Sequence, residues 1–516
     1  MLHCQSFIYF FAKLLAERGG GKIIEFVAVC FLIASSLFIS VNVANKFYDL
    51  SYDGQGYHQD TIIFLSQGWN PVYEKLTPES TPNLPRWKWL NSYPKASEEL
   101  GTIIYKATGK IEQAKGLNFM FSFMAFGFVL SFLWRIQSFN KIISLFIAIL
   151  LIWNPVHVTQ LFSFYLDGQL YLTLLSLISV LGMIYITHKN YLLLPLVALL
   201  TVAWNLKLTG VLYSTFFVGA FLVLSWYSEK ILLFFKKIQA YCIMLILAVV
   251  VIGFNPFITN LLQFHDPFYL PTEQNYLVSV NIPENYLEKN SIERFILSIF
   301  SKSDNIKGVG TNAELKVPFT YSVNEVDTFI HPDNNEGGFG PLFGAVFLVS
   351  IFTIISISFS KEYSRKQKMV FYFLLITIFI SSILIPPSSY ARYIPQFWIF
   401  PVVACLYAIS DRNMLSKFFG VMLLVLMVTN NLLITQKYFD YNYQTSRQLS
   451  GDLNQLRVMS EKSPLEVSFG VFRQNKVRFT EAGIDFKEND TLPCEESHQK
   501  RVLIHEVPES IIQICN

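Results

Sequence analysis

The sequence predicts a polytopic α-helical membrane protein, and three observations support this fold class. The 516-residue chain is 52% hydrophobic and only 15% charged, whereas soluble domains carry about a quarter charged residues. Eleven mainly apolar runs approach the ~20 residues that a helix needs to cross a bilayer. Basic residues gather in alternate connections between these runs. The short basic and aromatic segment "RWKW" (86–89) is typical of anchoring at the headgroup level, and no longer segment of this kind occurs, so we expect no nucleic-acid partner.

The apolar runs are the expected membrane helices. The third and fifth are short, which predicts tilted or half-buried helices. The first run is too long and too internal for a signal peptide, and no small-residue cleavage site follows it, so we expect it to remain as an anchor. The eleven runs lie near residues 23–44, 116–134, 142–156, 166–187, 190–204, 209–227, 239–258, 339–359, 369–386, 393–410 and 415–436.

The distribution of Lys and Arg predicts the orientation of these helices. When the N-terminus is placed in the cytoplasm, every expected inner segment is basic, as the positive-inside rule requires. The other side then faces outward, and we expect it to be a bacterial periplasm. The basic residues of the six inner segments are Lys13, Arg18 and Lys22; Arg135 and Lys141; Lys189; Lys230, Lys236 and Lys237; Lys361, Arg365, Lys366 and Lys368; and Arg412 and Lys417.

The same pattern divides the chain into two domains. Residues 1–436 form the membrane domain, which is interrupted by a first outer loop (45–115) and a second outer loop (259–338). Residues 437–516 have soluble composition and predict a small outer α/β domain, with a helix at 446–461 and strands at 465–472 and 500–506. In the first outer loop, residues 61–73 and 96–109 predict helices on the membrane surface.

Cysteines also bear on this outer domain. Cys494 and Cys515 could form a disulfide in an oxidising compartment, or remain two free thiols. There is no CxxC sequence and no zinc-like spacing.

The stretch "SYDGQGYHQD" (51–60) is the first candidate site. Gly54 and Gly56 follow Asp53 and would leave room for a ligand to approach the backbone, although Asp and Gly are also ordinary turn residues. Tyr57, His58 and Asp60 add an aromatic wall and groups that can transfer protons.

A second acid and two basic residues lie at other outer helix ends. Asp167 in "SFYLDGQLY" repeats the Asp-Gly-Gln sequence; a carboxylate there usually faces a cavity or partner, or it is an exposed loop residue. Lys207 and Arg392 are the Lys and Arg residues of the three short outer turns. A lipid phosphate would explain both, as would interface snorkelling or salt bridges to Asp53 or Asp167.

In the second outer loop, His265 and Asp266 are candidates for substrate contact, or they are simply solvated. No two-ligand spacing on a helix supports a metal site.

Five segments in this order resemble the GT-C glycosyltransferases: "YDGQGYH", "WNLKLTG", "NPFITNLLQFHDPFYLP", "GGFGPLFG" and "ARYIPQFW". This superfamily includes the protein O-mannosyltransferases and the lipid A aminoarabinose transferases. The resemblance covers about residues 45–400. Several of these families carry an Asp-Glu pair in the first loop, whereas Gly54 follows Asp53 here. A second acid would then come from Asp60, from Asp167, or from neither.

The resemblance implies a GT-C-like fold and a reaction. The donor would be a sugar on a polyprenyl phosphate, undecaprenyl phosphate in a bacterium, and the acceptor a hydroxyl of a surface glycan, lipid or protein. Asp53 would be the base of an inverting displacement, supported by Asp167, and Lys207 and Arg392 would bind the departing phosphate. Substrate contacts would come from Tyr57, His58, Asp60, His265 and Asp266.

No cofactor is required in principle for this reaction, and a divalent metal is an alternative without support in the ligand spacing. Two other functions stay open. A transporter or flippase would need polar groups at the membrane midplane as well, and a glycan polymerase or ligase would use similar basic residues.

Overall fold

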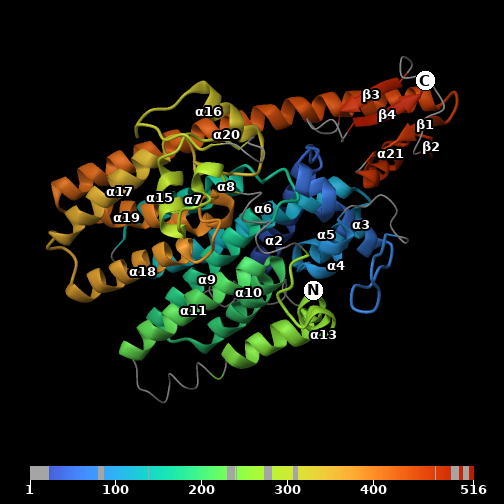
Figure 1. Ribbon diagram of the computed structural model, residues 1–516. Coiled ribbons are helices and arrows are strands. Elements are labelled where there is room, and N and C mark those ends of the chain that lie inside the picture. Colours follow the sequence, from blue (N-terminus) through green and yellow to red (C-terminus); the bar gives the residue numbers. More distant parts are fainter. Residues whose placement is uncertain are drawn as a thin grey trace.

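The fold is an elongated bundle of helices that carries a small β-sheet at one end (Figure 1). The structure is a computed structural model that describes residues 22–78, 86–136, 139–228, 239, 241–271, 282–305, 312–470, 472–489, 499–503 and 511–515. Both long loops and the C-terminal region emerge at one end of the bundle, which we call the loop face. The first-loop helices lie between the bundle and the sheet.

Every one of the eleven predicted apolar runs contains helix. The seventh run is bent, because the chain turns at Gly253 and Asn255. The principal helices are α2 (Lys22–Ala44), α6 (Gly116–Arg135), α7 (Lys141–Ile152), α9 (Asp167–Thr187), α10 (Leu193–Leu206), α11 (Leu208–Ser228), η4 (Leu247–Ile252) with η5 (Phe254–Ile258) and α13 (Thr259–Phe264), α17 (Phe343–Ser358), α18 (Arg365–Ile383), α19 (Ile399–Ser410) and α20 (Met414–Ser460).

Length and composition confirm a polytopic helical membrane protein. Among the described residues, six helices are long and apolar enough to cross a membrane, or seven if the pair bent by 85° counts as one span. Four further apolar helices are shorter: Lys141–Ile152, Asn190–Leu206, Phe343–Ser358 and Pro395–Ser410. They include the third and fifth runs, which the sequence already predicted to be short.

Short helices cover the loop face. In the first loop, a π-helical turn η1 (Gly54–His58) leads into α3 (Gln59–Ser66), followed by α4 (Trp87–Ser92), α5 (Ala96–Thr108) and η2 (Ile111–Lys115). Helix α5 ends at Gly109, whose φ of +68° stops the helix in the left-handed region. In the second loop, α15 (Ser291–Ile299) and α16 (Val323–Asp327) each begin with a capping box.

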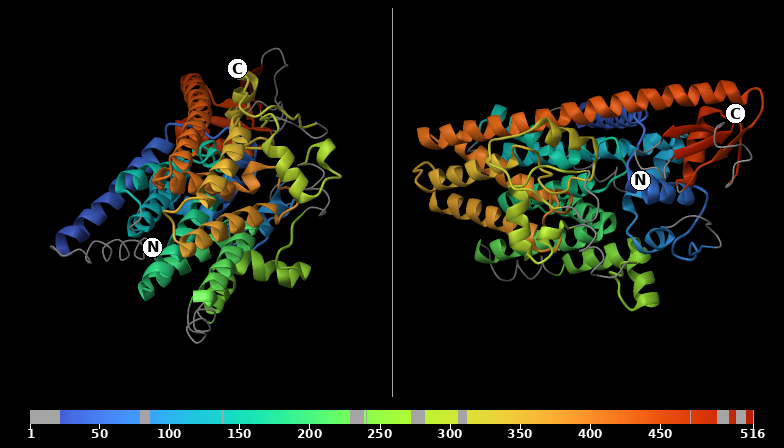
Figure 2. Two further views of the ribbon diagram at one scale, coloured as in Figure 1. Left: turned by 90° about the vertical axis from the view of Figure 1, so that its left-hand side faces the viewer. Right: turned by 45° about the horizontal axis from the view of Figure 1, so that its top comes forward.

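The C-terminal sheet is joined to the bundle by one continuous helix. Helix α20 has 47 residues and passes the predicted domain boundary at residue 436 without a break; Figure 2 shows it along one side of the molecule. The sheet has the order β2-β1-β4-β3, with β1 parallel to β2 and the other pairs antiparallel. Its elements are β1 (Leu465–Ser468), η10 (Arg473–Asn475), α21 (Lys476–Ala482), β2 (Phe486–Glu488), β3 (Gln499–Leu503) and β4 (Ile511–Cys515).

The sequence predictions for this region are partly visible in the structure. The expected helix at 446–461 is the end of α20, and the expected strands overlap β1 and β3. Cys494 lies outside the described residues, so its pairing with Cys515 remains a prediction.

Helix α9 is the central helix of the bundle. It is buried along nearly its whole length and packs against α6, α10 and α11. Its first residue, Asp167, therefore lies at the loop-face end of the most enclosed helix.

Candidate active site

Arg392 is the centre of a charged cluster at the loop face. It lies in the 3₁₀ turn η8 (Ala391–Tyr393) between α18 and α19. Its Nη1 lies 3.1 Å from Asp333 Oδ1 and 3.4 Å from Asp53 Oδ2. Tyr165 donates its hydroxyl to Asp333 Oδ1 at 2.9 Å. One guanidinium thus joins the first loop, the second loop and the turn before α19.

Asp167 and Lys207 form a second ion pair in the same region. Lys207 Nζ contacts Asp167 Oδ1, and Gln160 donates to Asp167 Oδ2 at 3.2 Å. The two side chains are only 13% and 4% exposed. The sequence analysis left open salt bridges for the two cations. The structure shows both, Lys207 with Asp167 and Arg392 with Asp53.

Tyr393 connects the two ion pairs. Lys207 Nζ lies 4.8 Å from the centre of its ring, and Arg392 Cζ lies 5.2 Å from it. Both distances are within the range of a cation–π interaction. The backbone of Tyr393 is held as well, because Tyr213 donates its hydroxyl to the Tyr393 carbonyl at 2.7 Å. The two cations are therefore fixed on one aromatic side chain.

Two further tyrosines face this cluster. Burial raises the pKa of Tyr57 well above its ordinary value, and the charge of Asp53 raises it further. Burial likewise raises the pKa of Tyr93 to about 12. Both hydroxyls therefore keep their protons at neutral pH and can donate hydrogen bonds to a ligand.

The two glycines of the turn that carries Asp53 pack closely against neighbouring side chains. A Cβ on Gly54 would lie 2.1 Å from Asp49 Oδ2, and one on Gly56 would lie 1.7 Å from Arg86 Nη1. The space beside these glycines is thus filled by protein side chains, whereas the sequence analysis expected it to admit a ligand. The glycines are needed here for close packing.

The C-terminal region also contacts this turn. Asn475 Nδ2 donates to Gln55 Oε1 at 3.0 Å, and Arg478 Nη1 donates to the same oxygen at 3.2 Å. Arg478 is buried and pairs with Glu112 at the start of the α6 span. Gln55 is two residues from Asp53, so α21 and η10 help to position the candidate base.

The side chains of His58 and Asp60 have partners other than the Arg392 cluster. His58 Nδ1 lies 2.5 Å from Glu98 Oε1 of α5, and both side chains are buried. Asp60 is buried too, and burial raises its pKa well above the ordinary range, opposed by the charges of Arg86 and Lys476. Neither is joined to Arg392 by a hydrogen bond or ion pair that the structure describes. Their predicted role as substrate contacts remains untested.

His265 and Asp266 lie on the exposed turn after α13. Asp266 Oδ1 accepts a hydrogen bond from the backbone of Phe268 at 2.9 Å, which is ordinary turn chemistry. The described contacts do not bring these two residues to the Arg392 cluster.

Asp333 is the functional candidate that the sequence analysis missed. It supplies a second carboxylate beside Asp53, a place for which the sequence analysis offered Asp60, Asp167 or neither. Burial raises the pKa of Asp333, while the charge of Arg392 lowers it. The available signal was weak: an acid in "HPDNNEGG", just before the tight turns that end the second loop.

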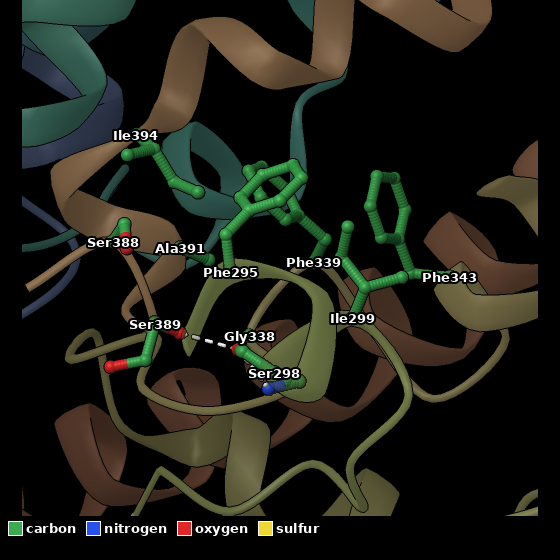
Figure 3. A pocket seen from close by; sticks show the side chains of 11 residues that line it. Phe295, Ser298, Ile299, Gly338, Phe339, Phe343, Ser388, Ser389, Ala391 and Ile394 are labelled. Atoms are coloured by element: carbon green, nitrogen blue, oxygen red, sulfur yellow. Dashed lines mark hydrogen bonds between the residues drawn. The ribbon is translucent and has the colours of Figure 1, made fainter. Parts of the chain in front are cut away.

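A small cavity lies behind the turn that carries Arg392. It is lined mainly by apolar side chains such as Phe295, Phe339 and Ile394 (Figure 3). Ser298 Oγ donates to the Ser389 carbonyl at 2.5 Å and ties α15 to this turn. The charged residues of the cluster do not line the cavity. Among the described residues, no group of three or more His, Cys, Asp or Glu side chains could hold a metal ion.

No protein-family model matches the chain, and no curated protein matches it. Two crystal structures of ArnT from Cupriavidus metallidurans are similar. The apo structure has a TM-score of 0.46 and 13% identity over 90% of this chain and 86% of that one. The structure bound to undecaprenyl phosphate has a TM-score of 0.47 and 13% identity over 89% and 85%.

Proposed function

We propose that the protein is an integral membrane glycosyltransferase. It would move a sugar from a polyprenyl-phosphate donor to a hydroxyl acceptor at the loop face. The observation that carries this proposal is the cluster around Tyr393, where Arg392 and Lys207 lie beside the carboxylates of Asp53, Asp333 and Asp167. Cations that could bind a phosphate thus lie beside carboxylates that could accept a proton, at the loop-face end of the apolar bundle. The resemblance of the loop sequences to GT-C enzymes points the same way.

The cations suit the departing lipid phosphate. Among the residues that the structure describes, the buried Nε of Arg392 has no hydrogen-bond partner. A phosphate oxygen would satisfy this donor, and charge-assisted bonds from Arg392 and Lys207 would stabilise the charge that grows on the leaving group. The phosphate would compete with carboxylates for these cations. Of these carboxylates, Asp333 has a pKa raised by burial and lowered by the charge of Arg392.

Asp53 is the proposed base. Asp53 lies 3.4 Å from Arg392, whereas Asp333 lies 3.1 Å from it. Asp53 therefore loses less interaction energy with Arg392 when its carboxylate turns to a substrate. The acceptor hydroxyl would pass its proton to Asp53 while its oxygen bonds to the anomeric carbon. The bond from that carbon to the phosphate oxygen would break, and the electron pair would leave with the phosphate. This single displacement inverts the anomeric centre.

The membrane arrangement completes the proposal. The loop face would be the periplasmic side of a bacterial inner membrane, and the lipid carrier would be undecaprenyl phosphate. The acceptor would be a surface glycan such as lipopolysaccharide, another lipid, or a protein. Asp167 would hold Lys207 in place, and Tyr57 would donate a hydrogen bond to the sugar.

The mass profile of cell-surface glycans tests the proposal. We would compare wild type, a deletion, Asp53→Asn and the matched control Asp440→Asn, an exposed acid of α20, at equal membrane abundance. The deletion and Asp53→Asn should lose the same single sugar mass, and Asp440→Asn should keep it. A wild-type profile for Asp53→Asn would remove Asp53 as the base. An unchanged profile in the deletion would overturn glycosyl transfer and favour transport.

A further inference from the structure

A segment of the second loop exposes a row of apolar side chains. Between residues 315 and 323, every second side chain is apolar and at least half exposed. An apolar row of this kind is unusual on a surface that faces water and marks an interaction site. The five residues and their exposed fractions are Leu315 (58%), Val317 (71%), Phe319 (50%), Tyr321 (53%) and Val323 (71%). We call them the apolar row.

Lys316, which lies between Leu315 and Val317 of the apolar row, points the other way. Lys316 Nζ contacts Glu325 Oε1 and donates to the Pro341 carbonyl at 2.5 Å, with only 7% of its side chain exposed. Ser322 caps α16. Here the charged side chain of Lys316 is turned inward while its apolar neighbours Leu315 and Val317 are exposed, which suits apolar surroundings.

One end of the apolar row lies at the level of the first turn of α17. Lys316 N donates to the Phe300 carbonyl at 2.9 Å. The Phe300 ring lies 6.1 Å from that of Phe347, and a Cβ on Gly344 would lie 3.1 Å from the Ile299 carbonyl. Gly344 and Phe347 belong to the first turns of the apolar helix α17. The row therefore begins beside the loop-face end of a membrane helix.

The other end lies at the level where α20 leaves the apolar region. Helix α20 carries no charged residue between Lys417 and Lys437, a rise of about 30 Å, which equals the hydrocarbon thickness of a bilayer. Lys437 thus marks the edge of the hydrocarbon. Its Nζ lies 2.7 Å from Asp327 Oδ1 at the end of α16, and Figure 1 shows α16 beside α20.

We propose that the apolar row lies in the lipid leaflet at the loop face. Its occupant would be acyl chains and the apolar part of the headgroup region, where Tyr321 and Phe319 fit as interface residues. Val323 precedes Asp333 by ten residues, so lipid would anchor the loop that brings Asp333 to Arg392. The anchoring needs none of the charged site residues, and it stands or falls independently of the transfer reaction.

Depth-dependent quenching tests this placement in the full-length protein. An environment-sensitive fluorescent amino acid would replace Val317 of the row, Val425 in the apolar part of α20, or Val458 near its end. The three valines are 71%, 57% and 54% exposed. Val458 lies 21 residues beyond Lys437, about 30 Å above the hydrocarbon edge. Each variant would be placed in vesicles of phosphatidylethanolamine and phosphatidylglycerol with a lipid nitroxide, and then exposed to iodide.

The label at 317 should behave like the one at 425. We expect strong loss of fluorescence with the nitroxide lipid, a blue-shifted emission and little loss with iodide. The label at 458 should show the opposite pattern. Quenching at 317 by iodide and not by lipid would overturn the proposal. Shielding from both quenchers that changes with the protein-to-lipid ratio would also overturn it, because a second copy or another protein would then cover the row.

Discussion

Replacing Arg478 by Met should loosen the turn that carries Asp53. The Arg478 side chain makes a concentrated set of buried contacts. Nε lies 2.7 Å from Glu112 Oε1, and Nη1 lies 2.9 Å from Asn475 Oδ1 and 3.2 Å from Gln55 Oε1. Nη2 lies 2.8 Å from the Asp49 carbonyl. The change to Met keeps much of the apolar stem and removes all of these donors.

The size of the effect follows from the partners that remain. Breaking a buried ion pair by removing one partner costs about 3–5 kcal/mol. The lower end applies here, because Lys115 still contacts Glu112. A sum over separate hydrogen bonds would be too large, since removing the guanidinium also removes its cost of burial. About 3 kcal/mol corresponds to roughly a hundredfold shift in the opening equilibrium of the turn.

Hydrogen exchange measured by mass spectrometry on a peptide covering residues 49–60 is the assay. Its amides should exchange roughly a hundredfold faster in Arg478→Met. The matched control is Lys487→Met in the same domain, whose side chain is 68% exposed and 3.8 Å from Glu466. Exposed pairs contribute about 0–1 kcal/mol, so the control should change little. In a transfer assay, Arg478→Met should lower kcat more than it raises KM. Equal exchange in the two variants would refute the positioning role of Arg478.

Three further predictions follow from the site and its supports. Burial raises the pKa of Glu481 to about 7. The raised pKa stabilises the folded state fully below about pH 4, and this stabilisation is lost as pH rises through 7. Amide hydrogen exchange in peptide 49–60 should therefore increase across neutral pH in wild type, and increase less in Glu481→Gln. Lys207→Met removes the charged partner of Asp167 and should raise KM for the lipid-phosphate donor about tenfold to a hundredfold, leaving KM for the acceptor nearly unchanged; an equal rise in both would contradict a donor-specific role. Gly54→Ala places a Cβ 2.1 Å from a buried carboxylate oxygen and should abolish transfer, while Gly451→Ala, with no atom within 4 Å, should match wild type in activity and thermal stability.

The helices could be predicted from the sequence because their signal is local. An uninterrupted apolar run indicates its own helix, whatever it packs against. The end of α20 shows the limit of this reasoning. Composition changes near residue 436, where the helix leaves the apolar region, but the helix continues because Leu449, Leu453 and Leu456 keep the spacing of one apolar face. The change in composition near residue 436 therefore does not mark the end of the helix.

The candidate site could be predicted only where a residue was unusual for its position. Lys207 and Arg392 are basic residues on the side that the sequence analysis expected to face outward. A salt bridge to Asp53 or Asp167 was one of the explanations it offered, and the structure shows Lys207 with Asp167 and Arg392 with Asp53. Asp333 and Arg478 are ordinary loop and helix residues in sequence. Arg392 is separated from Asp333 by 59 residues, and Arg478 from Gln55 by 423. No local pattern reports such contacts, because they depend on how the whole chain folds.

Because α20 is unbroken, it fixes both the direction and the distance of the C-terminal sheet relative to the bundle. One residue inserted between Lys437 and Leu449 would turn everything beyond it by about 100° and raise it by about 1.5 Å. Seven inserted residues would nearly restore the direction and lift the sheet by about 10 Å. Since Asn475 and Arg478 must meet Gln55, neither change can be absorbed by a hinge. The number of residues in this stretch is therefore constrained as tightly as the identity of any side chain in the site.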